Sequence, residues 1–252
     1  MILACSRNRR WLSNSWLVGD RPGGHAVLVD SGGPVEPLRE ALREHRLELD
    51  AVLCTHHHVD HVLHNEDWKR SEGCPVCGHP REEKLFGGLD RRLEDGDELE
   101  AGGLRIRALH IPGHTLGQLA FLVNGSHLFT GDTLFRGSVG GTVGPGHTTF
   151  EDLQHSILEK LFRLPPETEV LPGHMEATTL AREWEENPFL RLWRGLEAPQ
   201  AEAVTVFGRP ATLLLRARDY DGGSKCQVRF EDDGSLAVVP GSRVEPSVRK
   251  PD

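Results

Sequence analysis

A short run of histidines and one aspartate constrains this chain more than any other feature. The run reads His-x-His-x-Asp-His and extends from His56 to His61. Imidazole is the commonest biological ligand for zinc, and a carboxylate is a compatible partner. A helix would spread these side chains around its axis, whereas a tight loop lets His56 and His58 face one point while Asp60 and His61 face another. The run therefore predicts two metal ions that share one loop. A histidine tag is a poor alternative, because the run is internal and interrupted.

Three further candidate ligands occur in a matching local pattern. His114, Asp132 and His174 each come directly after a glycine, close to the end of the strand-like apolar segments 104–111, 127–130 and 168–171. His56 likewise follows the apolar segment 51–54. In open sheets with helices packed on them, ligands gather just beyond the strand ends. A glycine there turns the chain and lets it approach a bound ion closely. We therefore expect these side chains to converge on one site.

Together these motifs resemble the metallo-β-lactamase superfamily of hydrolases, and within it the glyoxalase II (hydroxyacylglutathione hydrolase) branch. The resemblance covers about residues 12 to 195, and it includes the segments Gly131-Asp132-Thr133-Leu134-Phe135 and Pro172-Gly173-His174. It implies an α/β fold, a four-layer αββα sandwich. It also implies one metal held by His56, His58 and His114, a second held by Asp60, His61 and His174, and Asp132 as the bridge between them. An aspartate at that last place is less similar to true β-lactamases.

The implied metal pair predicts hydrolysis of an activated acyl group. Two Zn²⁺ ions about 3.5–4 Å apart would share a bridging water and lower its pKa toward about 7. The metal-bridging hydroxide would cleave a thioester, ester or lactone of a small-molecule acyl substrate. Asp60 and Asp132 are the expected catalytic carboxylates, and Asp132 could accept the proton of the hydroxide after attack. The chain has no Gly-x-Ser-x-Gly nucleophile elbow and no phosphate-binding or dinucleotide-binding fingerprint.

Other functions remain compatible with the same residues. A mononuclear iron persulfide dioxygenase, from a related branch, would use His56, His114 and Asp132, and the metal would then be Fe²⁺, or a Zn/Fe mixture, instead of two Zn²⁺. A non-catalytic metal-binding or regulatory protein would keep the site without turnover. A β-lactamase or a nuclease fits less well. The formal net charge of −9 disfavours a nucleic-acid partner, because nucleic-acid binders usually carry a basic face.

The chain departs from glyoxalase II in the regions that would contact the substrate. A glycine-rich stretch, 136–147, follows Phe135, and in it Arg136 could bind a carboxylate and His147 could line the pocket. A surface charge and a loop-tip histidine are equally compatible readings. Glyoxalase II has a helical C-terminal region that helps to hold glutathione, whereas this chain has short strand-like segments. We expect a catalytic domain at 1–199 and a small β-rich appendage at 200–252, which covers the sandwich edge, supports a homodimer or borders the active-site mouth. Covering the edge is the simplest role, and the end of the chain from Val244 is expected to fray.

Apolar periodicity predicts alternating strands and helices. Asn124-Gly125 is a strong hairpin signal, and Thr148-x-x-Glu151 reads as a capping box at the start of a helix. Helices are expected at 34–46, 61–70, 151–162 and 179–186. Besides the segments already named, strands are expected at 15–18, 26–29, 119–123, 204–207, 211–217, 226–230 and 236–239.

The cysteines and the chain ends bear on compartment. The five cysteines are scattered, and an odd set is a poor disulfide framework. Cys74 and Cys77 could belong to a metal or redox site, but a closed zinc site needs a second pair, so a short buried strand is the simpler interpretation. No signal peptide and no apolar run of about 20 residues is present, so we expect a cytoplasmic protein without a membrane partner.

Overall fold

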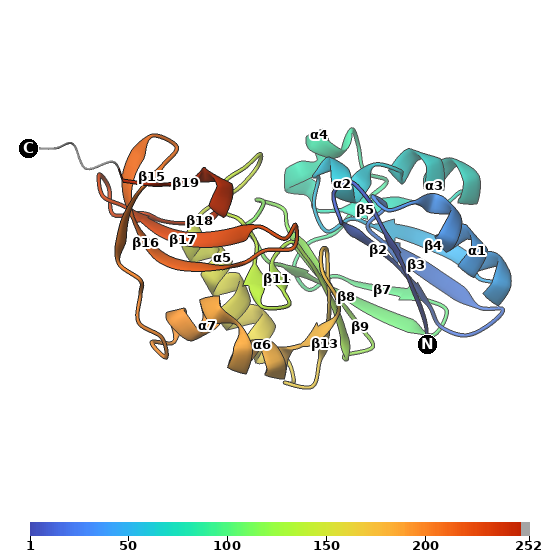
Figure 1. Ribbon diagram of the computed structural model, residues 1–252. Helices are drawn as coiled ribbons and strands as arrows, with labels where there is room; N and C mark the ends of the chain where they lie inside the picture. The colour runs from blue at the N-terminus through green and yellow to red at the C-terminus, as the bar shows by residue number, and fades with distance from the viewer. Residues whose placement is uncertain (248–252) are drawn as a thin grey trace, which may run out of the picture.

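Two β-sheets stacked face to face form the centre of the fold (Figure 1). The computed structural model describes residues 1–247. In the first sheet the N-terminal strands pair antiparallel and the later strands pair parallel, as expected when a helix connects one strand to the next. This sheet has the order β1 (Ile2–Arg7), β2 (Asn14–Gly19), β3 (His25–Val29), β4 (Glu48–Leu53), β5 (Val76–Gly78) and β6 (Arg91–Arg92).

The second sheet contains the expected hairpin and three of the predicted ligand-bearing strands. Asn124 and Gly125 both have positive φ angles, 50° and 69°, as the tight turn between β9 and β10 requires. Strands β10 and β13 pair parallel, so both present their carboxyl ends at the same edge. The order is β14 (Thr178–Thr179), β13 (Glu169–Pro172), β10 (His127–Gly131), β9 (Leu119–Val123), β8 (Leu104–His110) and β7 (Glu98–Ala101).

Helices cover the outer face of each sheet, which gives the four layers that the resemblance implies. Alternate apolar side chains of the two sheets, such as Val27 and Phe121, pack against each other between them. Trp68 packs with the outer residues of the first sheet, and Leu153 packs with those of the second. The helices are α1 (Val35–His45), α2 (Val59–Val62), α3 (Asn65–Glu72), α4 (Glu83–Phe86), α5 (Phe150–His155), α6 (Leu180–Glu186) and α7 (Pro188–Trp193), with short turns η1 (Pro80–Glu82), η2 (Ser156–Lys160), η3 (Leu161–Arg163) and η4 (Gly241–Arg243).

Two helix predictions were wrong in detail. The helix expected at 151–162 continues from α5 as a π-helical turn (η2) and a 3₁₀ turn (η3). Its N-cap is Thr149, whose side chain accepts from the backbone N–H of Asp152, so the predicted Thr148–Glu151 capping box is displaced by one residue. The helix expected at 61–70 is split into α2 and α3 at His64, whose ψ of 16° departs from helical geometry.

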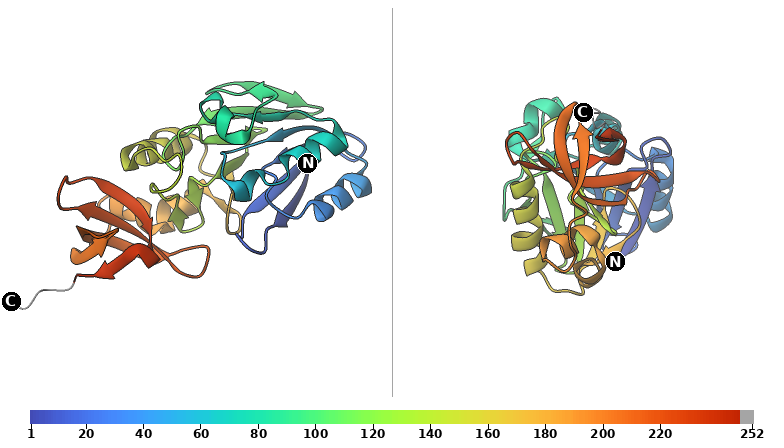
Figure 2. Two further views of the ribbon diagram at one scale, coloured as in Figure 1. Left: turned by 90° about the horizontal axis from the view of Figure 1, so that it is seen from above. Right: turned by 60° about the vertical axis from the view of Figure 1, so that its left-hand side comes forward.

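A separate sheet follows the sandwich and lies at one end of the molecule (Figure 2). Its side chains Leu215 and Val238 join the apolar cluster that also contains residues of α5 and α7, so this sheet packs against helices of the outer layer. That it covers an edge of the sandwich stays a prediction. The chain does not fray at Val244, because β19 pairs antiparallel with β15; the rest of that prediction, 248–252, lies outside the described residues. The division into domains at residue 199 stays a prediction. The sheet has the order β18 (Leu236–Pro240), β17 (Ser224–Phe230), β16 (Arg209–Arg218), β15 (Glu202–Val206) and β19 (Val244–Pro246).

The cysteine pair lies in the buried strand that the simpler interpretation predicted. Cys77 is in β5, Cys74 comes just before it, and neither forms a disulfide. Burial raises the pKa of Cys74 to about 11 and that of Cys77 to about 12, which disfavours the thiolate that metal binding or redox exchange needs. Across residues 1–247, no helix combines the length and the apolar composition needed to cross a membrane.

Candidate metal centre

The candidate ligands lie in loops that follow strands at one edge of the two sheets. His56 follows β4, His114 follows β8, Asp132 follows β10 and His174 follows β13. The sequence pattern of a strand, a turn and a ligand is therefore present at each place. The strand ends deliver the side chains to a common point because both sheets open toward the same edge.

The first group of ligand atoms consists of three imidazole nitrogens. His56 Nε2 lies 3.0 Å from His58 Nδ1, and His114 Nε2 lies 3.1 Å from the same atom. Lone pairs of neutral imidazoles that approach this closely repel each other unless a proton or a cation lies between them. The three atoms could hold one metal ion.

The second group combines two histidines with two carboxylates. The Nε2 atoms of His61 and His174 each lie 3.5 Å from Asp60 Oδ2. Asp132 lies between the groups: its oxygens are 3.3 Å from His61 Nε2, 3.3 Å from His174 Nε2 and 3.6 Å from His114 Nε2. His61 Nε2 and Asp132 Oδ1 are buried without a hydrogen-bond partner in the part of the chain that the structure describes. Buried polar atoms without partners are costly, and a cation would satisfy both.

Asp30 binds the ring nitrogen of His61 that faces away from the candidate metal site, and the sequence analysis did not identify it. Its Oδ2 accepts from His61 Nδ1 at 2.8 Å and from Thr55 Oγ1 at 2.8 Å, and its Oδ1 accepts from the Thr55 N–H at 2.8 Å. The carboxylate therefore fixes the His61 tautomer that leaves Nε2 free for a metal. A signal was present, because Asp30 follows the end of β3 just as His56 follows β4.

The glycine-rich stretch 136–147 folds over the first group of ligands. The carbonyl of Gly141 accepts from His114 Nδ1 at 2.8 Å, and the carbonyl of Pro145 accepts from His58 Nε2 at 2.9 Å. Both contacts leave the opposite ring nitrogen facing the centre. The backbone of this loop therefore forms a wall beside the first group of ligands.

Glu82 forms hydrogen bonds to the loop that carries the metal-binding residues His56 to His61. Its carboxylate accepts from the backbone N–H and from Nδ1 of His57, both at 2.9 Å, and from the N–H of Gly117 at 2.7 Å. Its side chain is almost completely buried. The loop that carries the ligands is thus bound at His57, between His56 and His58.

The electrostatics differ between the two groups. Burial lowers the pKa of His114 to about 4, and it lowers the pKa values of His56 and His58 as well. These rings are therefore neutral, which is the form that binds metals. Burial alone would lower the pKa of His61, but the charges of Asp132 and Asp30 raise it to about 10. Burial alone would raise the pKa of Asp132, but His174 and His61 hold it well below its ordinary range.

Glycine is required where the chain passes closest to the ligands. A Cβ atom on Gly173 would overlap Asp132 Oδ1, so the strand that carries His174 could not lie against the bridge. Gly131 has a φ of 48°, and a Cβ atom there would overlap the side chains of Gln118 and Thr55. The glycines that the sequence places before His174 and Asp132 thus serve close approach.

The two predicted substrate contacts lie outside the ligand cluster. His147 is exposed, and its Nδ1 lies 2.6 Å from the carbonyl of Gly144 within its own loop. Arg136 is also exposed and lines a pocket together with Tyr220. Tyr220 comes from the C-terminal sheet and stacks on His174, with ring centroids 3.9 Å apart and planes inclined by 14°. No signal in the sequence pointed to Tyr220, since the contact joins segments far apart in the chain.

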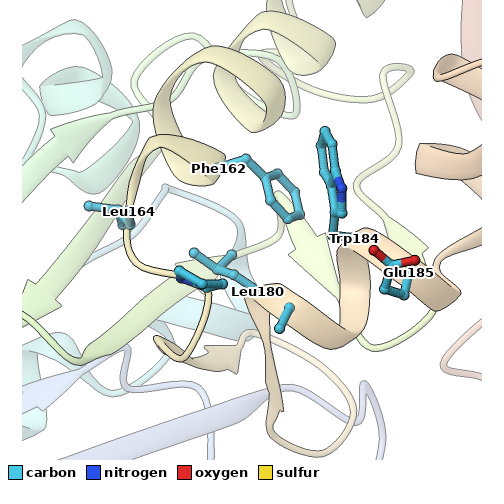
Figure 3. A pocket seen from close by; sticks show the side chains of 7 residues that line it. Phe162, Leu164, Leu180, Trp184 and Glu185 are labelled. Carbon is cyan, nitrogen blue, oxygen red and sulfur yellow. The ribbon is translucent and has the colours of Figure 1, made fainter.

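A second, mostly apolar pocket lies on the outer helical layer. It has a volume of about 300 Å³ and is lined by side chains that include Phe162, Leu180 and Trp184 (Figure 3). The rings of Phe162 and Trp184 lie 5.0 Å apart. None of its lining residues belongs to the candidate metal centre.

Comparison with known sequences agrees with this geometry. Residues 8–174 match the family model described as the metallo-beta-lactamase superfamily. An uncharacterized protein of Mycobacterium tuberculosis is 37% identical, with 75% of this chain and 94% of that protein covered. A hydroxyacylglutathione hydrolase of Photobacterium profundum is 39% identical (79% and 77% covered). A probable polyketide biosynthesis zinc-dependent hydrolase, BaeB, of Bacillus velezensis is 33% identical (66% and 75% covered).

Solved structures with different names share this fold. The B3 metallo-beta-lactamase BLEG-1 has a TM-score of 0.69 at 28% identity, with 75% of this chain and 99% of that chain covered. ETHE1 from Myxococcus xanthus has a TM-score of 0.66 at 28% identity (79% and 93% covered). A di-iron-bound form of TTHA1623 has a TM-score of 0.62 at 34% identity (75% and 100% covered).

Proposed function

The chain belongs to the metallo-β-lactamase superfamily, and we propose that it is a dinuclear zinc hydrolase that cleaves a thioester, ester or lactone. The observation that carries this proposal is the position of Asp132 between two groups of metal-binding atoms. Its oxygens approach His114 of the first group and His61 and His174 of the second within 3.6 Å. A single mononuclear site would not need a carboxylate that faces both groups. The likeness to hydroxyacylglutathione hydrolases and to a zinc-dependent hydrolase supports the same class of reaction.

The residues present fit a metal pair. His56, His58 and His114 would hold the first ion, and Asp60, His61 and His174 would hold the second, with Asp132 shared. The buried, unpartnered His61 Nε2 and Asp132 Oδ1 are the atoms that such ions would satisfy. Bound there, the ions would activate a water molecule as the nucleophile and polarise the acyl carbonyl.

The two carboxylates are suited to different tasks. The low pKa of Asp132 keeps its carboxylate ionised, which suits a bridging ligand. Asp60 is the more exposed of the two, with 18% of its side chain accessible against 10% for Asp132. We assign the bridging position to Asp132, whose oxygens face both groups, and a place at the second ion to Asp60, whose Oδ2 faces His61 and His174.

Elemental analysis of the protein purified without added metal, run beside an activity panel, tests this proposal. The panel contains a thioester, a lactone, a β-lactam and glutathione persulfide. We expect about two zinc ions per chain and hydrolysis of the thioester or the lactone. Hydrolysis of the β-lactam alone would refute the proposal that thioesters, esters or lactones are the substrates.

A substitution connects the site to the activity. His58→Ala should lose more than half of the bound metal and nearly all hydrolysis, because Nδ1 of His58 is the atom that both other nitrogens of its group approach. His147→Ala is the matched control, since the ring of His147 forms hydrogen bonds only within its own loop among the described residues. Full activity of His58→Ala would refute its assignment.

The likeness to ETHE1 and to a di-iron-bound protein favours one second candidate, an iron-dependent persulfide dioxygenase. It would use His56, His114 and Asp132, which are all present at the site. Iron in the purified protein, together with oxygen consumption on glutathione persulfide and no hydrolysis, would select this function over the first.

A further inference from the structure

The C-terminal sheet reaches the metal centre through the hairpin that connects β16 to β17. Tyr220 in this hairpin stacks on His174, and the ring of Phe135 meets both rings edge-on. Tyr220 is the only tyrosine of the chain. The sheet therefore forms part of the wall of the centre, in addition to packing against α5 and α7.

A buried ion pair holds the hairpin in this position. Lys225 Nζ lies 3.1 Å from Asp219 Oδ1, and both side chains are more than 90% buried. The same ammonium group lies 5.0 Å from the ring centroid of Phe135 and 5.3 Å from that of Tyr220. Lys225 is thus attracted both to the Asp219 carboxylate and to the rings of Phe135 and Tyr220.

A pocket of about 430 Å³ opens beside the Tyr220 ring. This volume is in the range of sites for small molecules. Its walls come from four parts of the chain: the end of β1, the residue after β11 (Leu134–Phe135), the segment after His174 and the end of β16. The side chains that matter here are Arg7, Arg136, Glu176, Arg218, Asp219 and Tyr220.

The pocket carries an excess of positive charge in a chain whose formal net charge is −9. Within residues 1–247, all arginine ion pairs involve other arginines than Arg136 and Arg218, and Arg7 donates only to the carbonyl of Leu12. The Asp219 carboxylate is paired with Lys225, which leaves Glu176 as the one unpaired carboxylate among the residues that line the pocket. Guanidinium groups with unused donors are suited to bind a carboxylate.

We propose that this pocket binds a carboxylate carried by the substrate, while the acyl bond to be cleaved lies at the metal centre. Tyr220 lines the pocket and its ring stacks on that of His174, so the pocket lies next to the centre, at a distance that a substrate of modest length can span. The substrate class is then an acyl compound with a negatively charged end. This inference rests on the hydrolase function proposed above.

The first test measures binding and needs no turnover. The zinc-loaded protein is prepared with 3-fluorotyrosine, so that its single fluorine resonance reports on residue 220. We expect glutarate to shift this resonance saturably and glutaramide, its neutral analogue, to leave it in place. Arg136→Gln and Arg218→Gln should each weaken glutarate binding about ten-fold. Arg229→Gln is the matched control, because Arg229 is exposed on the same sheet and does not line the pocket. Equal glutarate affinity in all these proteins would overturn the proposal.

The second test uses three thioesters of matched size: one neutral, one with a carboxylate on the acyl side and one with a carboxylate on the thiol side. We expect kcat/KM to be about ten-fold higher for one of the charged compounds, and this preference to disappear in Arg136→Gln and Arg218→Gln but not in Arg229→Gln. The preferred compound tells which side of the scissile bond lies in the pocket. Equal rates for all three would refute the charged subsite but keep the hydrolase. Absence of hydrolysis with all three would refute the hydrolase, and glutarate binding would still decide the subsite.

Discussion

Replacement of Asp30 by asparagine isolates the support that a single carboxylate gives to the metal centre. Asp30 is 2% exposed, and its two oxygens accept from His61 Nδ1, Thr55 Oγ1 and the Thr55 N–H, each at 2.8 Å. An asparagine amide has one oxygen and one NH₂ group, so at least one of these donors would face another donor. The backbone is not an obstacle, because Asp30 has a φ of 59°, a conformation that asparagine tolerates.

The magnitude follows from the contacts that are lost. A buried donor left without an acceptor costs about 1–3 kcal/mol, so Asp30→Asn should lower the free energy of unfolding of the metal-free protein by that amount. Loss of the residue that orients a metal-binding histidine typically costs 10–100-fold in metal affinity, which is about 1.4–2.8 kcal/mol. The loss should fall on the ion held by His61, and the ion held by His56, His58 and His114 should be affected less.

Zinc titrations in competition with a chromophoric chelator measure both affinities. Asp50→Asn is the matched control, because Asp50 Oδ1 also pairs with a histidine, His25 Nδ1, at 2.9 Å, but on the partly exposed surface. The control should bind zinc as the wild type does. If Asp30→Asn kept both zinc affinities and the urea midpoint of the wild type, the reasoning that Asp30 orients His61 would be refuted.

Three further outcomes are expected. In the metal-free protein the pKa of His61 is raised to about 10. The contribution of His61 to the free energy of unfolding is therefore complete below about pH 6.5 and is lost as the pH rises toward 10. Urea unfolding at several pH values should show this fall in stability, and a stability that does not change with pH would contradict it. Asp132→Ala should reduce the binding of both metals, whereas Asp60→Ala should mainly empty the second site; elemental analysis would expose an error if Asp132→Ala kept the wild-type metal content. Lys225→Met should lower the free energy of unfolding by about 3–5 kcal/mol, because Asp219 would keep a buried charge without a partner, and a wild-type urea midpoint would show that the pair is not needed.

The fold could be predicted in its elements and less well in its helix boundaries. Strands such as β9 and β10 were found because the apolar segments and Asn124-Gly125 are local signals. The wrong capping box shows the limit of such signals, since Thr148 and Thr149 are both good N-cap residues and only the structure shows which one accepts from the helix. The π-helical turn at η2 likewise has no distinctive sequence, because it depends on how the helix packs on the second sheet.

The sequence by itself determined the candidate ligands and the class of chemistry. Their residue types, their spacing from His56 to His61 and the glycine before each later ligand are all local properties, and each has a direct physical meaning. Only the tertiary structure decided what surrounds them. Asp30, Glu82 and Tyr220 act through contacts between segments distant in the chain, and no local pattern encodes a partner that another loop supplies. The reason is physical: the metal-binding preference belongs to a side chain, whereas the position of its neighbours results from the packing of the whole chain.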